Sequence, residues 1–157
     1  MWINPNFNKR AIYGEVSSKE INEANNLLLK FAPFLKSVFK ELESTDGIIE
    51  SPLMTLNKFG IKNLYLKEDN LLPIAGSVKA RGGIFEILKY AETLAANANL
   101  IDVEKDYSQF DSDVFRKFFS EYKIQVGSTG NLGISIGLIS AKLGFNAIVH
   151  MSKDAKN

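Results

Sequence analysis

The 157-residue sequence contains no cysteine and a single histidine, His150. Without cysteine there can be no disulfide framework, no thiolate nucleophile and no cysteine-based zinc site. One histidine is also a poor basis for metal-dependent hydrolysis or for a Ser-His or Cys-His triad, so we expect no metal site and no such triad. The absence of cysteine fits a reducing, cytoplasmic setting.

The sequence also lacks an excess of charge of either sign and any long apolar run. Nineteen Lys and Arg residues oppose 18 Asp and Glu residues, for a formal net charge of +1. This balance gives no electrostatic footprint for nucleic acid or for an anionic membrane surface. No stretch approaches the length needed to cross a bilayer, and the first residues show no basic segment followed by an apolar one. We therefore expect neither a nucleic-acid partner nor a membrane partner.

Helical signals dominate the first third of the chain. Ser17 and Glu20 have the spacing of a capping box, and apolar residues follow at helical intervals up to Phe31. Pro33 predicts the end of this helix and the start of a second one, because proline suits a first turn but not a helix interior. We interpret residues 1–60 as an N-terminal helical segment.

The remainder, residues 61–157, has the pattern of an α/β domain. A strand-like run at 64–66 leads into a loop and a helix that Ser77 is predicted to cap. Residues 98–112 show no sustained period and are predicted to be an insertion. A Phe-rich helix follows, capped by Asp111 or Ser112, and one face of it is predicted to pack in the core: Val114, Phe115, Phe118, Phe119 and Tyr122. The last third reads as strand, glycine loop, helix and strand, with Gly144 ending the helix. This is the βαβ unit of a parallel sheet. No complete helix follows the final strand to cover its apolar surface, which predicts a partial domain that is truncated at its C-terminus.

Lys79 is the first candidate for chemistry. It falls in the first turn of a predicted helix, where the helix dipole disfavours a positive charge, and Arg81 lies nearby. Both effects favour the neutral amine, which a lysine needs in order to form an imine. The plain alternative is a solvated lysine that tolerates this position.

The second candidate is the loop Gly127-Ser128-Thr129-Gly130-Asn131 between a strand and a helix. Its glycines permit a tight turn, and the backbone N–H groups of a helix N-terminus suit a carboxylate or a phosphate. The loop is neither a Walker A motif nor the dinucleotide fingerprint. An ordinary βα turn explains it equally well.

Together, in this order, the two loops resemble those of the pyridoxal-phosphate enzymes of the tryptophan-synthase β type. Within that superfamily the sequence is most similar to the D-serine dehydratases, and the similarity runs almost from end to end. It rests on these segments: Trp2-x-Asn4-Pro5, Phe31-Ala-Pro-Phe-Leu35, Gly47-Ile-Ile-Glu-Ser51, Leu72-Pro73-x-x-Gly-Ser-x-Lys-Ala-Arg-Gly-Gly83, Asp106-Tyr107-Ser108 and Val126-Gly-Ser-Thr-Gly-Asn-Leu-Gly133. Threonine dehydratases usually show Asn-His-Ala where this sequence has Asn131-Leu132-Gly133.

The resemblance implies a role for each candidate residue. Lys79 would hold pyridoxal 5'-phosphate through an imine, and Asn131 would hydrogen-bond the ring oxygen of that cofactor. Ser128, Thr129 and Gly130 would cradle the substrate carboxylate. The implied reaction is α,β-elimination of water from D-serine, which yields pyruvate and ammonia.

The resemblance also implies that a large part of the family's length is missing. The later glycine-rich loop that holds the cofactor phosphate is not present, and neither is the partner of the pyridine nitrogen. A chain with the lysine but without the phosphate site should bind the cofactor weakly, so we expect little or no activity from this polypeptide alone. Two alternatives are a related lyase acting on threonine or another small amino acid, and a non-catalytic remnant that needs a partner chain, such as a separate C-terminal half.

Overall fold

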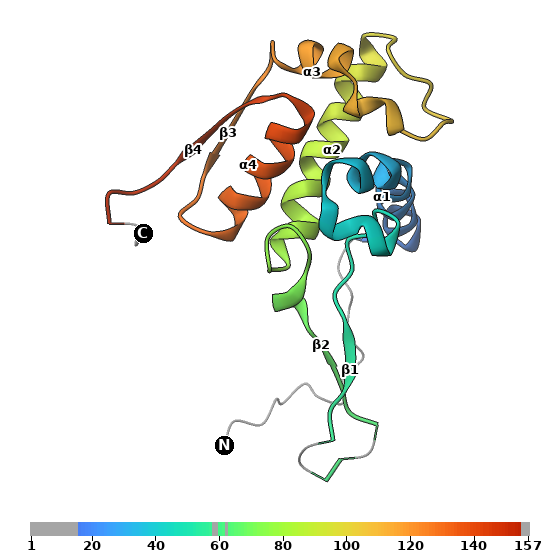
Figure 1. Cartoon of the computed structure of the whole chain (residues 1–157), viewed down its shortest axis with the longest axis vertical. Coiled ribbons are helices and arrows are strands. Elements are labelled where there is room, and N and C mark those ends of the chain that lie inside the picture. Colours follow the sequence, from blue (N-terminus) through green and yellow to red (C-terminus); the bar gives the residue numbers. More distant parts are fainter. Residues whose placement is uncertain (1–15, 58–59, 62, 155–157) are drawn as a thin grey trace.

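The computed structural model describes residues 16–57, 60–61 and 63–154, and it shows a mixed α/β fold (Figure 1). The segment around Trp2 that contributed to the resemblance lies outside these residues. The elements follow one another as α1 (Ser18–Val38), η1 (Lys40–Thr45), β1 (Leu53–Thr55), β2 (Tyr65–Lys67), η2 (Asp69–Leu71), α2 (Lys79–Asn97), η3 (Ser108–Asp111), α3 (Asp113–Phe119), β3 (Lys123–Gly127), α4 (Asn131–Leu143) and β4 (Asn146–His150), where η denotes a 3-10 helix.

Helix α1 begins at the predicted capping box but does not end at Pro33. The Ser17 hydroxyl accepts the Glu20 N–H at 3.3 Å, and the Glu20 carboxylate accepts the Ser17 N–H at 2.7 Å. The helix then continues through Pro33 to Val38, so the prediction of two helices separated at this proline is wrong. Pro33 itself is exposed, whereas Phe31 and Phe34 on either side are fully buried. Burial of these rings outweighs the cost of proline inside a helix.

The strands form two separate pairs. β1 and β2 form an antiparallel ribbon in which Met54 pairs with Leu66, and β3 and β4 are parallel, with Gln125 opposite Ile148. Helix α4 connects β3 to β4, which confirms the predicted βαβ unit and gives a small parallel sheet. The β1–β2 ribbon extends away from the helical body (Figure 1), and every residue of its two strands is exposed.

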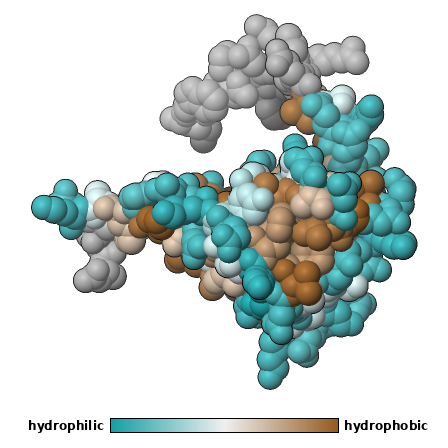
Figure 2. Space-filling model, turned by 90° about the horizontal axis from the view of Figure 1, so that it is seen from above, coloured by the Kyte–Doolittle hydropathy of each residue, from teal (hydrophilic) through white to brown (hydrophobic). Residues whose placement is uncertain are grey.

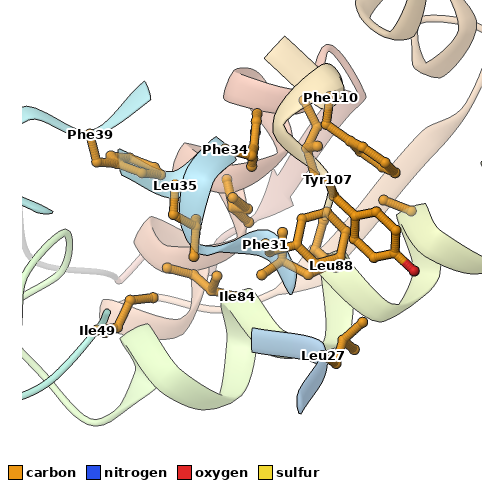
Figure 3. Packing of buried hydrophobic residues seen from close by; sticks show 14 of the residues in the cluster. Leu27, Phe31, Phe34, Leu35, Phe39, Ile49, Ile84, Leu88, Tyr107 and Phe110 are labelled. Carbon is orange, nitrogen blue, oxygen red and sulfur yellow. The ribbon is translucent and has the colours of Figure 1, made fainter. Parts of the chain in front are cut away.

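The core is a cluster of aromatic rings that joins distant parts of the chain. Phe31 and Phe34 of α1 contact Phe110 at ring-centroid distances of 5.0 and 6.4 Å, and Phe110 stacks on Phe115 at 4.6 Å. Figure 3 shows Phe31, Tyr107 and Phe110 turned toward one another between α1 and α2. Segment 98–112, predicted to be an insertion, therefore supplies central core residues.

The Phe-rich helix α3 packs into this core as predicted, with one exception. Phe115 and Phe119 are buried, while Val114, which was predicted to share their face, is 66% exposed. Ser112 occupies the N-cap position, and Gly144 ends α4 with a left-handed φ of 96°. A side chain at Gly144 would lie 2.7 Å from the Arg116 carbonyl oxygen, so this turn requires glycine both for its φ and for its contact.

Candidate functional site

Lys79 is the first residue of α2, as the sequence predicted, and its side chain is exposed. The Ser77 hydroxyl accepts the Lys79 N–H at 3.3 Å, but the N-cap residue of the helix is Val78, which has helical backbone angles. The prediction of Ser77 as N-cap is therefore wrong by one residue, because the chain already turns at Val78. Among the described residues, the Lys79 Nζ takes part in no hydrogen bond or ion pair. Its amine is thus available to a small molecule.

The predicted glycine loop connects β3 to α4. Thr129, Gly130 and Asn131 are exposed, and Ser128 is half-buried. The Ser128 hydroxyl accepts two N–H groups, from Gly130 at 3.3 Å and from Gly133 at 3.0 Å. The Ser128 N–H in turn donates to the His150 carbonyl oxygen at 3.0 Å, which ties the loop to the end of β4.

The two candidate segments meet because α2 and α4 pack side by side with their first turns at the same end (Figure 1). The contact begins at Gly83, where an added Cβ would lie 3.1 Å from Leu132 Cδ1 and 3.3 Å from Ile136 Cγ1. Lys79 lies one turn before Gly83, and Asn131 lies directly before Leu132. The structure therefore brings Lys79 and the loop 127–131 to one end of the helix pair.

This end of the helix pair has a positive electrostatic character. Two helix N-termini, each the positive end of a helix dipole, point the same way, and exposed Arg81 lies in the first turn of α2. An anionic small molecule is the ligand that such an arrangement favours. An exposed amine beside N–H donors can bind a compound that carries both an aldehyde and negatively charged groups.

Other polar residues near the strands have structural partners. The Asp69 carboxylate accepts the Ser51 hydroxyl at 2.7 Å, and His150 Nε2 lies 2.9 Å from Gln125 Oε1. Within the described ranges no cluster of three His, Cys, Asp or Glu residues could hold a metal ion. In the same part of the chain, no helix combines the length and the apolar character needed to cross a membrane.

Two features of the site went unrecognised in the sequence. One is the close approach of α2 to α4 at Gly83, and the other is the hydrogen bond from the Gly133 N–H to the Ser128 hydroxyl. Both depend on glycines inside helices. The only available signal was the presence of glycine where helix propensity disfavours it, which often marks a close contact.

Comparison with known proteins identifies the class to which this chain belongs. Residues 44–157 match the family described as "Pyridoxal-phosphate dependent enzyme", and this range includes Lys79 and the whole glycine loop. The chain therefore belongs to the pyridoxal-phosphate dependent enzymes.

The similar proteins carry a more particular name. The chain is 52% identical over 172 residues to a "Probable D-serine dehydratase" of Fusobacterium nucleatum. Proteins of the same name from Bacillus cereus and Acinetobacter baumannii are 50% and 47% identical to it over 169 residues. Each alignment covers 99% of this chain but 38% of the relative. The chain thus spans about two fifths of the length of these relatives.

Proposed function

We propose that this chain carries the lysine and the carboxylate-binding loop of a D-serine dehydratase. The reaction would be elimination of water from D-serine, followed by release of pyruvate and ammonia. The observation that carries this proposal is the placement of Lys79 and loop 127–131 at one end of the packed helices α2 and α4. The name shared by relatives that are about half identical to the chain supports the choice of substrate.

The residues at this end of the helix pair fit pyridoxal 5'-phosphate in part. Lys79 would hold the cofactor through its side-chain nitrogen, and the Asn131 amide would hydrogen-bond its ring oxygen. When bound, the cofactor supplies an electron sink that stabilises negative charge at the substrate Cα. The loop that contains Ser128, Thr129 and Gly130 is the candidate that holds the substrate carboxylate.

In this arrangement Lys79 has a second task. Its Nζ, when neutral, can accept the proton that leaves the substrate Cα. The loop N–H groups fix the carboxylate and thereby orient the Cα–H bond toward the lysine.

An association with further polypeptide is also part of the proposal. The β1–β2 ribbon exposes apolar side chains along both strands, including Leu53 at 63% and Tyr65 at 57%. A two-stranded ribbon is marginally stable alone, and open strand edges favour pairing with other chains. Seen from above, apolar surface also gathers in the middle of one face (Figure 2). The polypeptide that the relatives carry beyond the matched 38% is the partner we propose for these surfaces.

Covalent trapping with the cofactor tests the site directly. We expect borohydride reduction of the chain with pyridoxal phosphate to label Lys79 selectively, as mapped by peptide mass spectrometry. Lys79→Ala should abolish this label, whereas Lys117→Ala, at an exposed lysine of α3, should leave it unchanged. Diffuse labelling that is the same in both variants would contradict the proposed role of Lys79.

Turnover tests the substrate and the activity. We expect D-serine to give pyruvate in preference to threonine, in a reaction mixture that also contains polypeptide corresponding to the rest of a relative. The chain by itself should give little or no pyruvate, because binding and orientation of the cofactor require more contacts than these residues supply. A preference for threonine under the same conditions would favour the related lyase instead.

A cytoplasmic location remains a prediction from the lack of cysteine.

A further inference from the structure

The hydroxyl of Ser128 is fully used inside its own loop. Its oxygen accepts the N–H groups of Gly130 and Gly133. The hydroxyl donates to the Gly130 carbonyl oxygen, with 3.4 Å between the two oxygen atoms. A serine hydroxyl has one proton and two lone pairs, so these contacts account for its whole hydrogen-bonding capacity. Since the Ser128 N–H is also given to His150, both polar groups that could reach a ligand from this residue are engaged.

Gly133 makes this arrangement possible. An added Cβ at position 133 would lie 2.9 Å from Val149 Cγ1 and 3.3 Å from the Ser128 Cβ. Any side chain at this position would therefore push Ser128 away from the helix or displace β4. One turn later in the same helix, no atom of the described residues lies within 4 Å of a Cβ added at Gly137. The requirement for glycine is thus specific to the residue that donates to Ser128.

We infer that Ser128 is a positioning residue, seated by Gly133, and that it shapes the carboxylate site without binding the carboxylate itself. This inference rests on the proposed function for its ligand only. Ser128 takes the Gly133 N–H, whereas the N–H groups of Asn131 and Leu132 lie in the first turn of α4 and have no acceptor within the helix. These two N–H groups, with exposed Thr129, are the donors left for the carboxylate.

Amide hydrogen exchange measured by NMR on the 157-residue chain tests the positioning role. In Ser128→Ala the Gly133 N–H loses its acceptor, and we expect its exchange to accelerate about 5- to 10-fold, as for loss of a helix N-cap. Ser128→Thr keeps a hydroxyl on the same carbon and should restore slow exchange to within about twofold. Unchanged exchange in the alanine variant, or equal acceleration in both variants, would overturn the inference.

The role of Gly133 in holding Ser128 in place is tested with two glycine variants of α4. Gly133→Ala should accelerate exchange of the Gly130 N–H, because the new methyl group displaces the Ser128 hydroxyl. Gly137→Ala adds the same methyl group to open space and should leave that exchange unchanged. Equal exchange rates of the Gly130 N–H in the two variants would contradict a specific role of Gly133 in placing Ser128.

Binding of D-serine distinguishes a failure of this inference from a failure of the proposed function. D-serine added to the chain with pyridoxal phosphate should shift the amide resonances of Asn131 and Leu132, and Ser128→Ala should reduce these shifts severalfold while Ser128→Thr preserves them. If the amide resonances do not respond even in a mixture that also contains polypeptide corresponding to the rest of a relative, but the exchange pattern is as expected, the proposed function fails and the positioning role stands. If Ser128→Ala binds D-serine as the unaltered chain does, the positioning role fails instead.

Discussion

Single residues decide how closely the elements of this protein approach one another. The chain turns at Asp46-Gly47, with left-handed φ values of 52° and 83°. An added Cβ at Gly47 would lie 1.9 Å from the Ala32 carbonyl oxygen of α1. The chain can return against α1 only because this residue has no side chain. Gly60 has a similar φ of 65°, and none of the residues that the structure describes lies within 4 Å of an added Cβ, so it isolates the effect of φ.

We predict that Gly47→Ala lowers the free energy of unfolding by about 2–5 kcal/mol, since it combines a strained φ with a backbone clash. Gly60→Ala carries the φ penalty without the clash and should cost about 1–2 kcal/mol. Urea denaturation followed by circular dichroism measures both. Equal losses would show that the contact with Ala32 is unimportant.

Single residues also show how far sequence reasoning reaches at the site. Lys79 was recognisable because a lysine in the first turn of a helix conflicts with the dipole, and residues 127–131 because glycines follow a strand. The inward turn of the Ser128 hydroxyl was not recognisable. It accompanies the close approach of β4 to Gly133, where an added Cβ would lie 2.9 Å from Val149 Cγ1, and β4 is placed by its pairing with β3.

At the scale of elements, α1 shows tertiary packing prevailing over local preference. The helix includes Pro33, although proline removes one N–H donor and crowds the preceding turn. Its buried face, with Phe31, Phe34 and Leu35, lies against the core on both sides of the proline. Local propensity predicted a break here, and only the long-range contacts of these residues explain its absence.

Replacement of this proline should stabilise the protein. Pro33 is exposed, so Pro33→Ala restores a backbone donor and helix propensity without loss of core contacts. We expect a gain of about 1–3 kcal/mol in the free energy of unfolding. Urea denaturation checks this, and a loss of stability would mean that the proline ring makes a contact that its exposure hides.

The start of α1 should depend on pH through Glu20. The backbone N–H of Ser17 holds the pKa of the Glu20 carboxyl below its ordinary value. A carboxyl whose pKa is lowered by folding stabilises the folded state above its unfolded pKa of about 4.5, and this contribution is lost as pH falls through the folded pKa.

Glu20→Gln should therefore lower the melting temperature at pH 7 more than at pH 3. Glu23→Gln is the matched control on the same helix, because among the described residues the exposed Glu23 side chain pairs with Lys19 alone. Thermal denaturation of the unaltered chain, Glu20→Gln and Glu23→Gln at pH 7 and pH 3 tests this prediction. A pH-independent difference for Glu20→Gln would argue against a charged capping box.

At the scale of the whole molecule, one aromatic cluster joins α1 to the segment that follows α2. Phe110 contacts rings from residues 31 to 119, and the apolar core extends from Leu27 to Phe145. The division of the chain at residue 60 remains a prediction. Because α1 packs on α2 and on η3, we expect both parts to unfold in one transition.

Phe110→Ala tests this shared core. Removing a fully buried ring should lower the free energy of unfolding by about 3–5 kcal/mol and should affect α1 and α4 together. Val114→Ala, at a residue that is 66% exposed on the adjacent helix, should change it by no more than about 0.5 kcal/mol. Loss of α4 structure while α1 persists would indicate two independent units.

The sequence by itself determined the local elements and the chemistry available. The capping box, the βαβ pattern, the turn at Gly144 and the lysine and glycine loops all follow from residue spacing and from backbone preferences that act within a few residues. Tertiary structure alone decided that α1 continues through Pro33, that Tyr107 and Phe110 enter the core, and that Lys79 and loop 127–131 lie at one end of a helix pair. These outcomes depend on contacts between residues distant in sequence, whose energies no local pattern contains.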